Sequence, residues 1–293
     1  MTLTEIQFDK PPTKRHAIFI AAGDKETFAS YALQNLAAYF DILIFFYGDD
    51  AKVRAGLERN ARFLAVGSAT KFNALKSLDA ASGIVVRYRT IWVCDDDIVL
   101  CAGDPRRLPH ILATFHLKVL SPVHSPAGKV SHAIMLAQAG PHAFRFVNFV
   151  EMTCPLFDAW SLSSFLHAYD GSLDGMGLDW WYMAFLESET RRNAAMVDGI
   201  TILNPDNRQK NQDIREIDKF NSCGERERQW LYAQSRYPHD LQYSVAPREQ
   251  HTFEYSHADR RRGFVFIWKI FTGVLKAALS PFRHFSRDEC AAG

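Results

Sequence analysis

The feature that most constrains this sequence is an apolar run, Ile91 to Cys94, that ends abruptly in three consecutive carboxylates, Asp95, Asp96 and Asp97. A run rich in Ile, Trp and Val is typical of a buried β-strand, and a buried strand does not tolerate three unpaired negative charges in its middle. The acids therefore mark the end of the strand. Because ligands bind beyond the carboxyl ends of strands in open α/β sheets, we expect a binding site here.

Side chains alternate along an extended chain, which predicts that Asp95 and Asp97 point to one side and Asp96 to the other. A pair of carboxylates suits a hard divalent cation, Mn²⁺ or Mg²⁺, whose shell is completed by substrate phosphates. We therefore predict Asp95 and Asp97 as metal ligands and Asp96 as a substrate contact. Two other interpretations stay open. One is an Asp-rich turn, and the other is the nucleophile motif of haloacid-dehalogenase-type phosphotransferases, in which Asp95 attacks phosphorus.

Apolar runs and helical patterns alternate through the first hundred residues. Strands are predicted at residues 16–22, 41–47 and 62–66, with helices between them. Strand–helix–strand order predicts parallel pairs with right-handed crossovers, and hence an α/β domain. A further helix at residues 70–78 carries Lys71, which we predict to face a diphosphate.

The middle of the chain adds a second group of candidate residues. After a short strand at residues 117–120, a Ser-Pro-rich loop is predicted at 121–128, and another strand at 144–152. Near the end of that strand, Glu151 is a candidate acceptor contact, although an acid on the surface of an edge strand would look the same.

A glycine-rich loop then precedes a helix that is predicted to run from Asp179 to Glu189. An acid in the first helical turn is favoured by the helix dipole, which alone explains Asp179. A sugar pocket would need the same residues, because the indole of Trp180 stacks on a pyranose ring while a carboxylate takes a proton. We therefore predict Asp179 as the catalytic acid or base and Trp180 as a substrate contact.

Three motifs in this order, residues 91–97, 149–157 and 175–180, resemble an uncharacterised family of plant and bacterial proteins that is similar to glycosyltransferases of the GT-A fold. The resemblance spans residues 15–205 and implies a mixed, mostly parallel sheet flanked by helices. It also implies that Asp95 and Asp97 hold the metal and nucleotide and that Asp179 is the acid of the Gly-Leu-Asp motif. Such families usually end a later strand in a histidine that completes the metal shell. Asn204 stands there instead, which weakens metal dependence or leaves Asn204, Asp206 or water as the substitute.

Composition bounds the remaining possibilities. Hydrophobic residues make up 47% of the 293 residues and charged residues 23%, which is typical of a folded soluble protein. A net charge of +1 gives no general attraction for nucleic acid. Five scattered cysteines predict neither a disulfide scaffold nor a zinc site. Residues 1–14 lack the apolar segment of a signal peptide, which predicts a cytoplasmic protein.

The C-terminal part changes character twice. Residues 206–258 are polar and predict a helical extension that packs on the main domain. Residues 259–287 are apolar but carry a basic residue at every seventh position, namely Arg262, Lys269, Lys276 and Arg283. That spacing places the charges on one stripe of a helix, as in helices that lie in a membrane interface. A helix docked on the protein itself or on a dimer partner is the alternative.

Together these features predict a polar leader at residues 1–15, a GT-A-like catalytic domain at 16–205, the extension and the amphipathic helix. The expected function is metal-assisted transfer of a sugar from a nucleotide-diphosphate sugar to a glycan or lipid-linked acceptor, as in bacterial polysaccharide biosynthesis, at the inner face of the membrane. The alternatives are a phosphotransferase that uses Asp95 and a non-catalytic membrane-associated module that has lost the metal.

Overall fold

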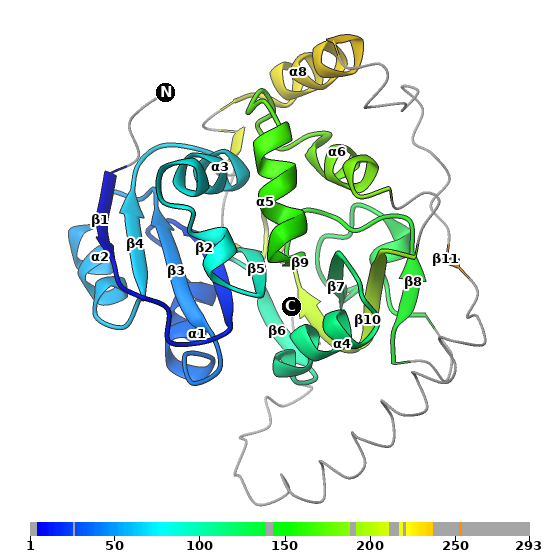
Figure 1. Ribbon diagram of the computed structural model, residues 1–293. Helices are drawn as coiled ribbons and strands as arrows, with labels where there is room; N and C mark the ends of the chain where they lie inside the picture. The colour runs from blue at the N-terminus through cyan, green and yellow to red at the C-terminus, as the bar shows by residue number, and fades with distance from the viewer. Residues whose placement is uncertain are drawn as a thin grey trace, which may run out of the picture.

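The computed structural model describes residues 5–25, 27–138, 143–187, 192–210, 217–218, 221–236 and 252–253. Its centre is one large sheet with the strand order β1-β4-β3-β2-β5-β9-β7-β10-β8-β11, and β6 pairs with β10 (Figure 1). The strands are β1 (Glu5–Asp9), β2 (His16–Ala22), β3 (Asp41–Phe46), β4 (Phe63–Val66), β5 (Thr90–Asp95), β6 (Val99–Ala102), β7 (Val119–His124), β8 (Arg145–Val147), β9 (Leu156–Asp158), β10 (Ala194–Leu203) and β11 (Thr252–Phe253).

The centre of the sheet is parallel. Strands β2, β3, β4 and β5 pair in parallel, as do β7 and β10, while β9 runs antiparallel between β5 and β7. Helices flank the sheet: α1 (Thr27–Asn35), α2 (Ala51–Glu58), α3 (Lys71–Ser82), α4 (Leu108–Thr114), α5 (Ala159–Ala168), α6 (Leu178–Phe185) and α8 (Cys223–Arg236), with short 3-10 turns at Val85–Arg87, Pro105–Arg107 and Ala133–Met135. The predicted α/β fold is confirmed.

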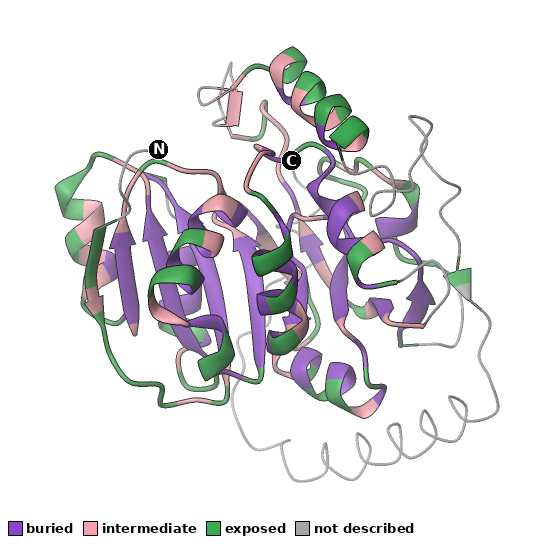
Figure 2. Ribbon diagram, turned by 45° about the horizontal axis from the view of Figure 1, so that its top comes forward, coloured by how far each residue is buried: buried purple, intermediate pink, exposed green. Residues whose placement is uncertain are grey.

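Strand β5 separates two hydrophobic cores, because its successive side chains point to opposite faces of the sheet. Ile91 and Val93 pack with residues of α3, α5 and α6 on one face of the sheet. Trp92 and Cys94 pack with residues of α1, α2 and α4 on the other face. Figure 2 shows the resulting pattern, with buried strands inside and exposed outer faces on the helices. The central strands are apolar on both sides because both of their faces are covered.

The structure corrects three sequence-based expectations. Residues 5–9, expected in a polar leader, form β1 and pair with β4 along the edge of the sheet. The predicted strand at 144–152 is regular only at β8. Strand β7 continues through Pro122 to His124, where a loop was predicted. Pro122 is accommodated because β9 pairs with Val119 and Leu120 only, so the ladder has ended on that side of the strand.

Two further expectations concern the cysteines and the tail. Cys94, Cys154 and Cys223 are free, whereas Cys101 is disulfide-bonded, which the scattered spacing did not predict. The amphipathic helix predicted at residues 259–287 lies outside the described residues. Within the part of the chain that the structure describes, no helix combines the length and the hydrophobicity that crossing a bilayer requires.

Candidate active site

The candidate residues meet at the carboxyl-terminal ends of the parallel strands, which all lie on the same side of the sheet. Gly23 follows β2, and Asp95 ends β5 beside it. His124 ends β7 and is in register with Ile202 of β10. Since Leu203 pairs with Val99 on the other side of β10, Asn204 lies beside the acidic turn. Residues far apart in sequence thus surround the three aspartates, as the switch-point rule for open sheets predicts.

Asp95 is held by a buried lysine. Lys71, at the start of α3, is 6% exposed, and its Nζ lies 2.7 Å from Asp95 Oδ1. The same ammonium donates to the carbonyl oxygens of Met152, at 2.7 Å, and Thr153, at 3.0 Å. An ammonium has three donors, and all three are used within the protein. In this structure Lys71 therefore orients Asp95, and its contact with a diphosphate remains a prediction.

Asp96 points away from its neighbours, towards the loop after β2. The Gly23 N–H donates to Asp96 Oδ2 at 2.7 Å, and the Tyr47 hydroxyl lies 3.3 Å from the same oxygen. Burial, and then the charge of Asp97, raise the pKa of Asp96 to about 7. The carboxylate thereby ties the ends of β2 and β3 to the acidic turn, and a substrate contact by Asp96 remains a prediction.

Asp97 faces the loop after β10, where Lys210 forms an ion pair with its Oδ2. Both side chains stay accessible, with 32% of Asp97 and 22% of Lys210 exposed. The loop is shaped by Asp206, whose carboxylate accepts the Gln209 N–H at 2.9 Å. Lys210 was placed in the polar extension by sequence, and its position beside Asp97 depends on how this loop folds back.

The acidic turn fits a divalent cation that is carried mainly by a substrate. Asp95 Oδ2 and Asp97 Oδ1 have no hydrogen-bond partner among the described residues, and 41% of the Asp95 side chain is exposed. No group of three or more His, Cys, Asp or Glu side chains able to hold a metal ion occurs in the described ranges. Mg²⁺ commonly takes one or two carboxylates and completes its shell with substrate phosphates and water. The residues thus suit that arrangement rather than a closed protein cage.

Glu151 and Asp179 form a second acidic centre, next to the first. Asp179 is 8% exposed, in the first turn of α6, and its Oδ1 accepts the Trp180 N–H at 3.0 Å. Burial, and then the charge of Glu151, raise the pKa of Asp179 to about 7, against hydrogen bonds from the Trp180 and Met152 backbone. A carboxylate with a pKa near neutrality is suited to taking a proton from a substrate.

Two histidines lie against Glu151. His124 is 1% exposed, and its Nδ1 lies 3.9 Å from Glu151 Oε2. Neither ring nitrogen of His124 nor Glu151 Oε2 has a hydrogen-bond partner among the residues that the structure describes. Burial lowers the pKa of both His124 and His132, so both imidazoles are neutral at pH 7. Buried polar atoms without partners are rare, and they mark positions where water or a ligand group is bound.

An aromatic wall completes this centre. The rings of Phe149 and Trp180 lie 4.5 Å apart, and His132 contacts both, at 4.6 Å from Phe149 and 6.3 Å from Trp180. Trp180 packs as a partly buried member of the core cluster. The predicted sugar contact by Trp180 is thus next to Asp179 and Glu151, as the sequence suggested, and its role remains a prediction.

The glycine loop serves a purpose that the sequence did not reveal. Gly177 has a φ of +84°, and a Cβ there would lie 2.2 Å from the indole of Trp230 on α8. Nearby, Asp174 accepts hydrogen bonds from Asn73, at 3.2 Å, and from the Gln229 side chain, at 3.0 Å. The loop is therefore the surface on which the C-terminal extension docks, which fixes the start of α6 and with it Asp179.

Comparison with known proteins gives limited information. No protein-family model matches this chain, and no curated protein matches it either. It is similar to the crystal structure of S. aureus TarS 1–349, with a TM-score of 0.45 and 10% identity over 76% of this chain and 74% of that one. A second TarS structure has a TM-score of 0.48 at 10% identity, over 79% of this chain and 46% of that one.

A third structure, TarS 1–349 in complex with UDP, has a TM-score of 0.40 at 12% identity, over 79% of this chain and 76% of that one. Similarity at this level supports no conclusion about activity.

Sequence reasoning missed three residues of this site. His124 was assigned to a loop because Ser-Pro pairs usually end strands. Lys210 carried no motif, and His132 lies in a segment without periodicity. The signal available for His124 was its position directly after Val123, shortly beyond the strand predicted at residues 117–120.

Proposed function

We propose that this protein is a glycosyltransferase that moves a sugar from a nucleotide-diphosphate donor to a hydroxyl group of a glycan or lipid-linked acceptor. The supporting observation is that residues 151–153 connect the two acidic centres. The Asp95 N–H and the Lys71 ammonium both donate to the carbonyl of Thr153, and Asp179 is held by the Met152 backbone. A group bound at the acidic turn and a base at Asp179 are thereby set in one rigid frame.

Transfer requires that the acceptor oxygen attack the anomeric carbon while the bond from that carbon to the diphosphate oxygen breaks. The acceptor hydroxyl loses a proton in this step, and Asp179 is the residue suited to take it, because its pKa of about 7 allows the ionised form at neutral pH. The electron pair of the breaking bond leaves with the nucleoside diphosphate. A single displacement of this kind inverts the anomeric centre.

The departing diphosphate gains negative charge as it leaves, and the acidic turn alone would repel it. A Mn²⁺ or Mg²⁺ ion held by the open oxygens of Asp95 and Asp97 would neutralise that charge. Lys210 adds a positive charge at the same place, since its ammonium lies on Asp97 and is partly exposed. Lys71 keeps Asp95 in position for this role.

The acceptor side of the site is assigned to Glu151, His124 and Trp180. Glu151 Oε2 and the His124 ring nitrogens are buried and have no hydrogen-bond partner within the described ranges, which suits hydroxyl groups that both donate and accept hydrogen bonds. The indole of Trp180 offers an apolar face beside them. Attachment to a membrane surface through residues 259–287 is part of the proposal, and flotation with anionic liposomes, compared with a chain ending at residue 258, tests it.

Calorimetry and product analysis with a panel of nucleotide sugars, with and without Mn²⁺, test the enzymatic proposal. We expect metal-dependent binding of one donor, loss of that binding in Asp97→Asn, and unchanged binding but no turnover in Asp179→Asn. Lys210→Met should weaken donor binding while it leaves Mn²⁺ binding intact, which separates the two positive charges. An aspartyl-phosphate trapped on Asp95 would instead establish a phosphotransferase. Absence of binding by every donor would favour a non-catalytic module.

A further inference from the structure

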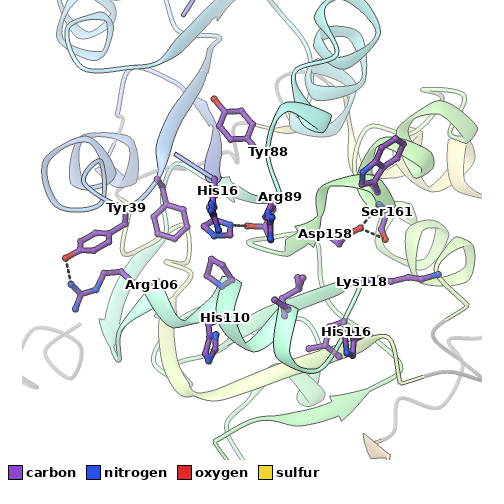
Figure 3. A pocket seen from close by; sticks show the side chains of 18 residues that line it. His16, Tyr39, Tyr88, Arg89, Arg106, His110, His116, Lys118, Asp158 and Ser161 are labelled. Atoms are coloured by element: carbon purple, nitrogen blue, oxygen red, sulfur yellow. Dashed lines mark hydrogen bonds between the residues drawn. The ribbon is translucent and has the colours of Figure 1, made fainter. Parts of the chain in front are cut away.

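A second site lies at the amino-terminal ends of the parallel strands, opposite to the acidic centres (Figure 3). It is a pocket of about 860 Å³, lined among others by Arg15, His16, Arg89, Lys118 and Trp160. Arg15, Arg89 and Lys118 lie just before β2, β5 and β7, His16 is the first residue of β2, and Trp160 lies in the first turn of α5. The volume is within the range of small-molecule sites. None of these residues contributes to the acidic centres described above.

Strand β5 separates the two sites. Thr90, its first residue, lines the pocket, and Asp95, its last, belongs to the acidic turn. A strand rises about 3.3 Å per residue, so roughly 17 Å of backbone lies between the two sites. A ligand in the pocket therefore does not reach the candidate catalytic residues unless it is a long polymer.

The pocket carries positive charge that no side chain among the described residues pairs with. The side chains of Arg15, Arg89 and Lys118 have no hydrogen bond or ion pair with any described residue, as the hydrogen bonds and salt bridges of the described ranges show. Asp158 is the carboxylate in the lining, and its Oδ2 is occupied by the N–H and hydroxyl of Ser161, each at 3.0 Å.

Two of these cationic residues are neighbours along the backbone. The Arg89 N–H donates to the Arg15 carbonyl at 2.7 Å, so the two residues are neighbours across the start of β2 and β5. Burial, and then the charges of Arg89 and Arg15, lower the pKa of His16 between them. His16 is therefore neutral and available as a hydrogen-bonding group, and its Nδ1 lies 2.9 Å from the Thr90 hydroxyl.

Aromatic rings are exposed beside the charges. Trp160 is 73% exposed, and Tyr39 is 48% exposed. The Arg106 guanidinium lies 4.7 Å from the centre of the Tyr39 ring and donates to its hydroxyl at 2.8 Å, which holds the ring in place. Figure 3 shows Tyr39 and Arg106 at one end of the pocket, Lys118 at the other, and His16 and Arg89 between them.

We infer that this pocket binds an anionic sugar, in which carboxylate or phosphate groups meet Arg15, Arg89 and Lys118 while a pyranose face stacks on Trp160. Guanidinium groups bind planar carboxylates and phosphates in bidentate fashion, and exposed indole rings provide an apolar surface with little loss of entropy. A net charge of +1 gives the chain no general attraction for nucleic acid, so recognition of an anion here depends on these local cations. The inference does not depend on the proposed transferase activity.

Calorimetry with four probes on the full chain tests it: tetragalacturonate for carboxylates, a hexose 6-phosphate for phosphate, maltotetraose as the neutral sugar, and single-stranded DNA as a competing polyanion. The pocket variant carries Arg15→Gln, Arg89→Gln and Lys118→Gln. The matched control removes three charges from α2 and its end, with Lys52→Gln, Arg54→Gln and Arg59→Gln. Thermal unfolding of both variants checks that they fold.

We expect one of the anionic probes to bind, with affinity that falls as salt rises, and maltotetraose not to bind. The pocket variant should lose at least tenfold in affinity, as should Trp160→Ala, while the control stays within twofold. Preference between the two anionic probes identifies the charged group.

The inference would be overturned by any of four results: equal binding of the neutral sugar, equal loss of affinity in the control, tighter binding of single-stranded DNA than of either anionic sugar, or no binding. Mn²⁺ binding at Asp97 should be unchanged in the pocket variant, so failure here is distinct from failure of the proposed function.

Discussion

His124 Nδ1 lies 3.9 Å from Glu151 Oε2, and neither atom has a hydrogen-bond partner in the described part of the chain. The distance is too long for a hydrogen bond, and leaving such groups unpaired in a protein interior costs about 1–3 kcal/mol each. Natural proteins keep such destabilising unpaired groups where the groups serve a function. The pair is therefore the part of the site most directly tested by substitution.

Replacing His124 by Leu removes two unpaired nitrogens but keeps an apolar side chain of similar reach. We expect the melting temperature to stay equal or rise, and the KM for the acceptor to rise at least tenfold with little change in kcat. A fall in stability with unchanged KM would show that His124 is only a packing residue. His167→Leu, on α5 and outside the site, is the control and should leave KM unchanged.

Glu151→Gln removes the charge that, after burial, raises the pKa of Asp179. The pKa of Asp179 should fall, and the rising limb of the rate against pH should shift to lower pH from its midpoint near 7. The pH–rate profile from pH 5 to 9 measures this. A midpoint that stays in place would mean that Asp179 does not set the pH dependence.

Asp179→Asn should abolish turnover yet stabilise the protein at high pH. The folded pKa of about 7 lies above the ordinary 3.8, so the folded state binds the proton more tightly, and the stability present below pH 4 is lost as pH rises through 7. The raised pKa of Asp179 lowers the free energy of unfolding by about 4 kcal/mol at most between pH 4 and pH 8. Urea unfolding at pH 8 and pH 4 should show a more stable variant at pH 8 and a much smaller difference at pH 4.

Lys71→Met leaves the Asp95 carboxylate and the carbonyls of Met152 and Thr153 without their donor. Lys71 is buried but 41% of the Asp95 side chain is exposed, so we expect a loss of about 1–3 kcal/mol in denaturant unfolding, the cost of leaving buried polar groups unpaired, together with weaker Mn²⁺ binding. Lys76→Met is the matched control, since the Lys76 ammonium donates to one acceptor among the described residues, the Leu166 carbonyl at 2.7 Å. Equal losses in the two variants would contradict the role assigned to Lys71.

Gly177→Ala should separate α8 from the glycine loop. The backbone there has a φ of +84°, and the added Cβ would overlap the Trp230 ring, so the C-terminal extension must shift. Limited proteolysis should cut near residues 221–236 faster than in the parent. Gly224→Ala adds the same methyl group in open space and should leave the cleavage rate unchanged.

The sequence by itself determined where the central strand ends and which way its side chains point, because both depend only on neighbouring residues. An apolar run followed by three aspartates can only be a buried strand that ends at Asp95, and the twofold alternation of an extended chain sent Asp96 away from Asp95 and Asp97. The strand–helix order likewise predicted the parallel centre of the sheet, because crossovers between parallel strands are right-handed and need a helix.

Only the tertiary structure decided which side chains meet. The position of Lys71 under Asp95 depends on how α3 packs against residues 152–153, and no periodicity encodes a contact between residues 24 positions apart in sequence. His124 became part of the site because β7 continues through Pro122, which is possible only where its neighbour β9 has already ended. The glycine loop before α6, which the sequence suggested as part of a sugar pocket, contacts α8 instead. The sequence could not show this contact, because the close approach of two segments depends on how they pack and not on either segment alone.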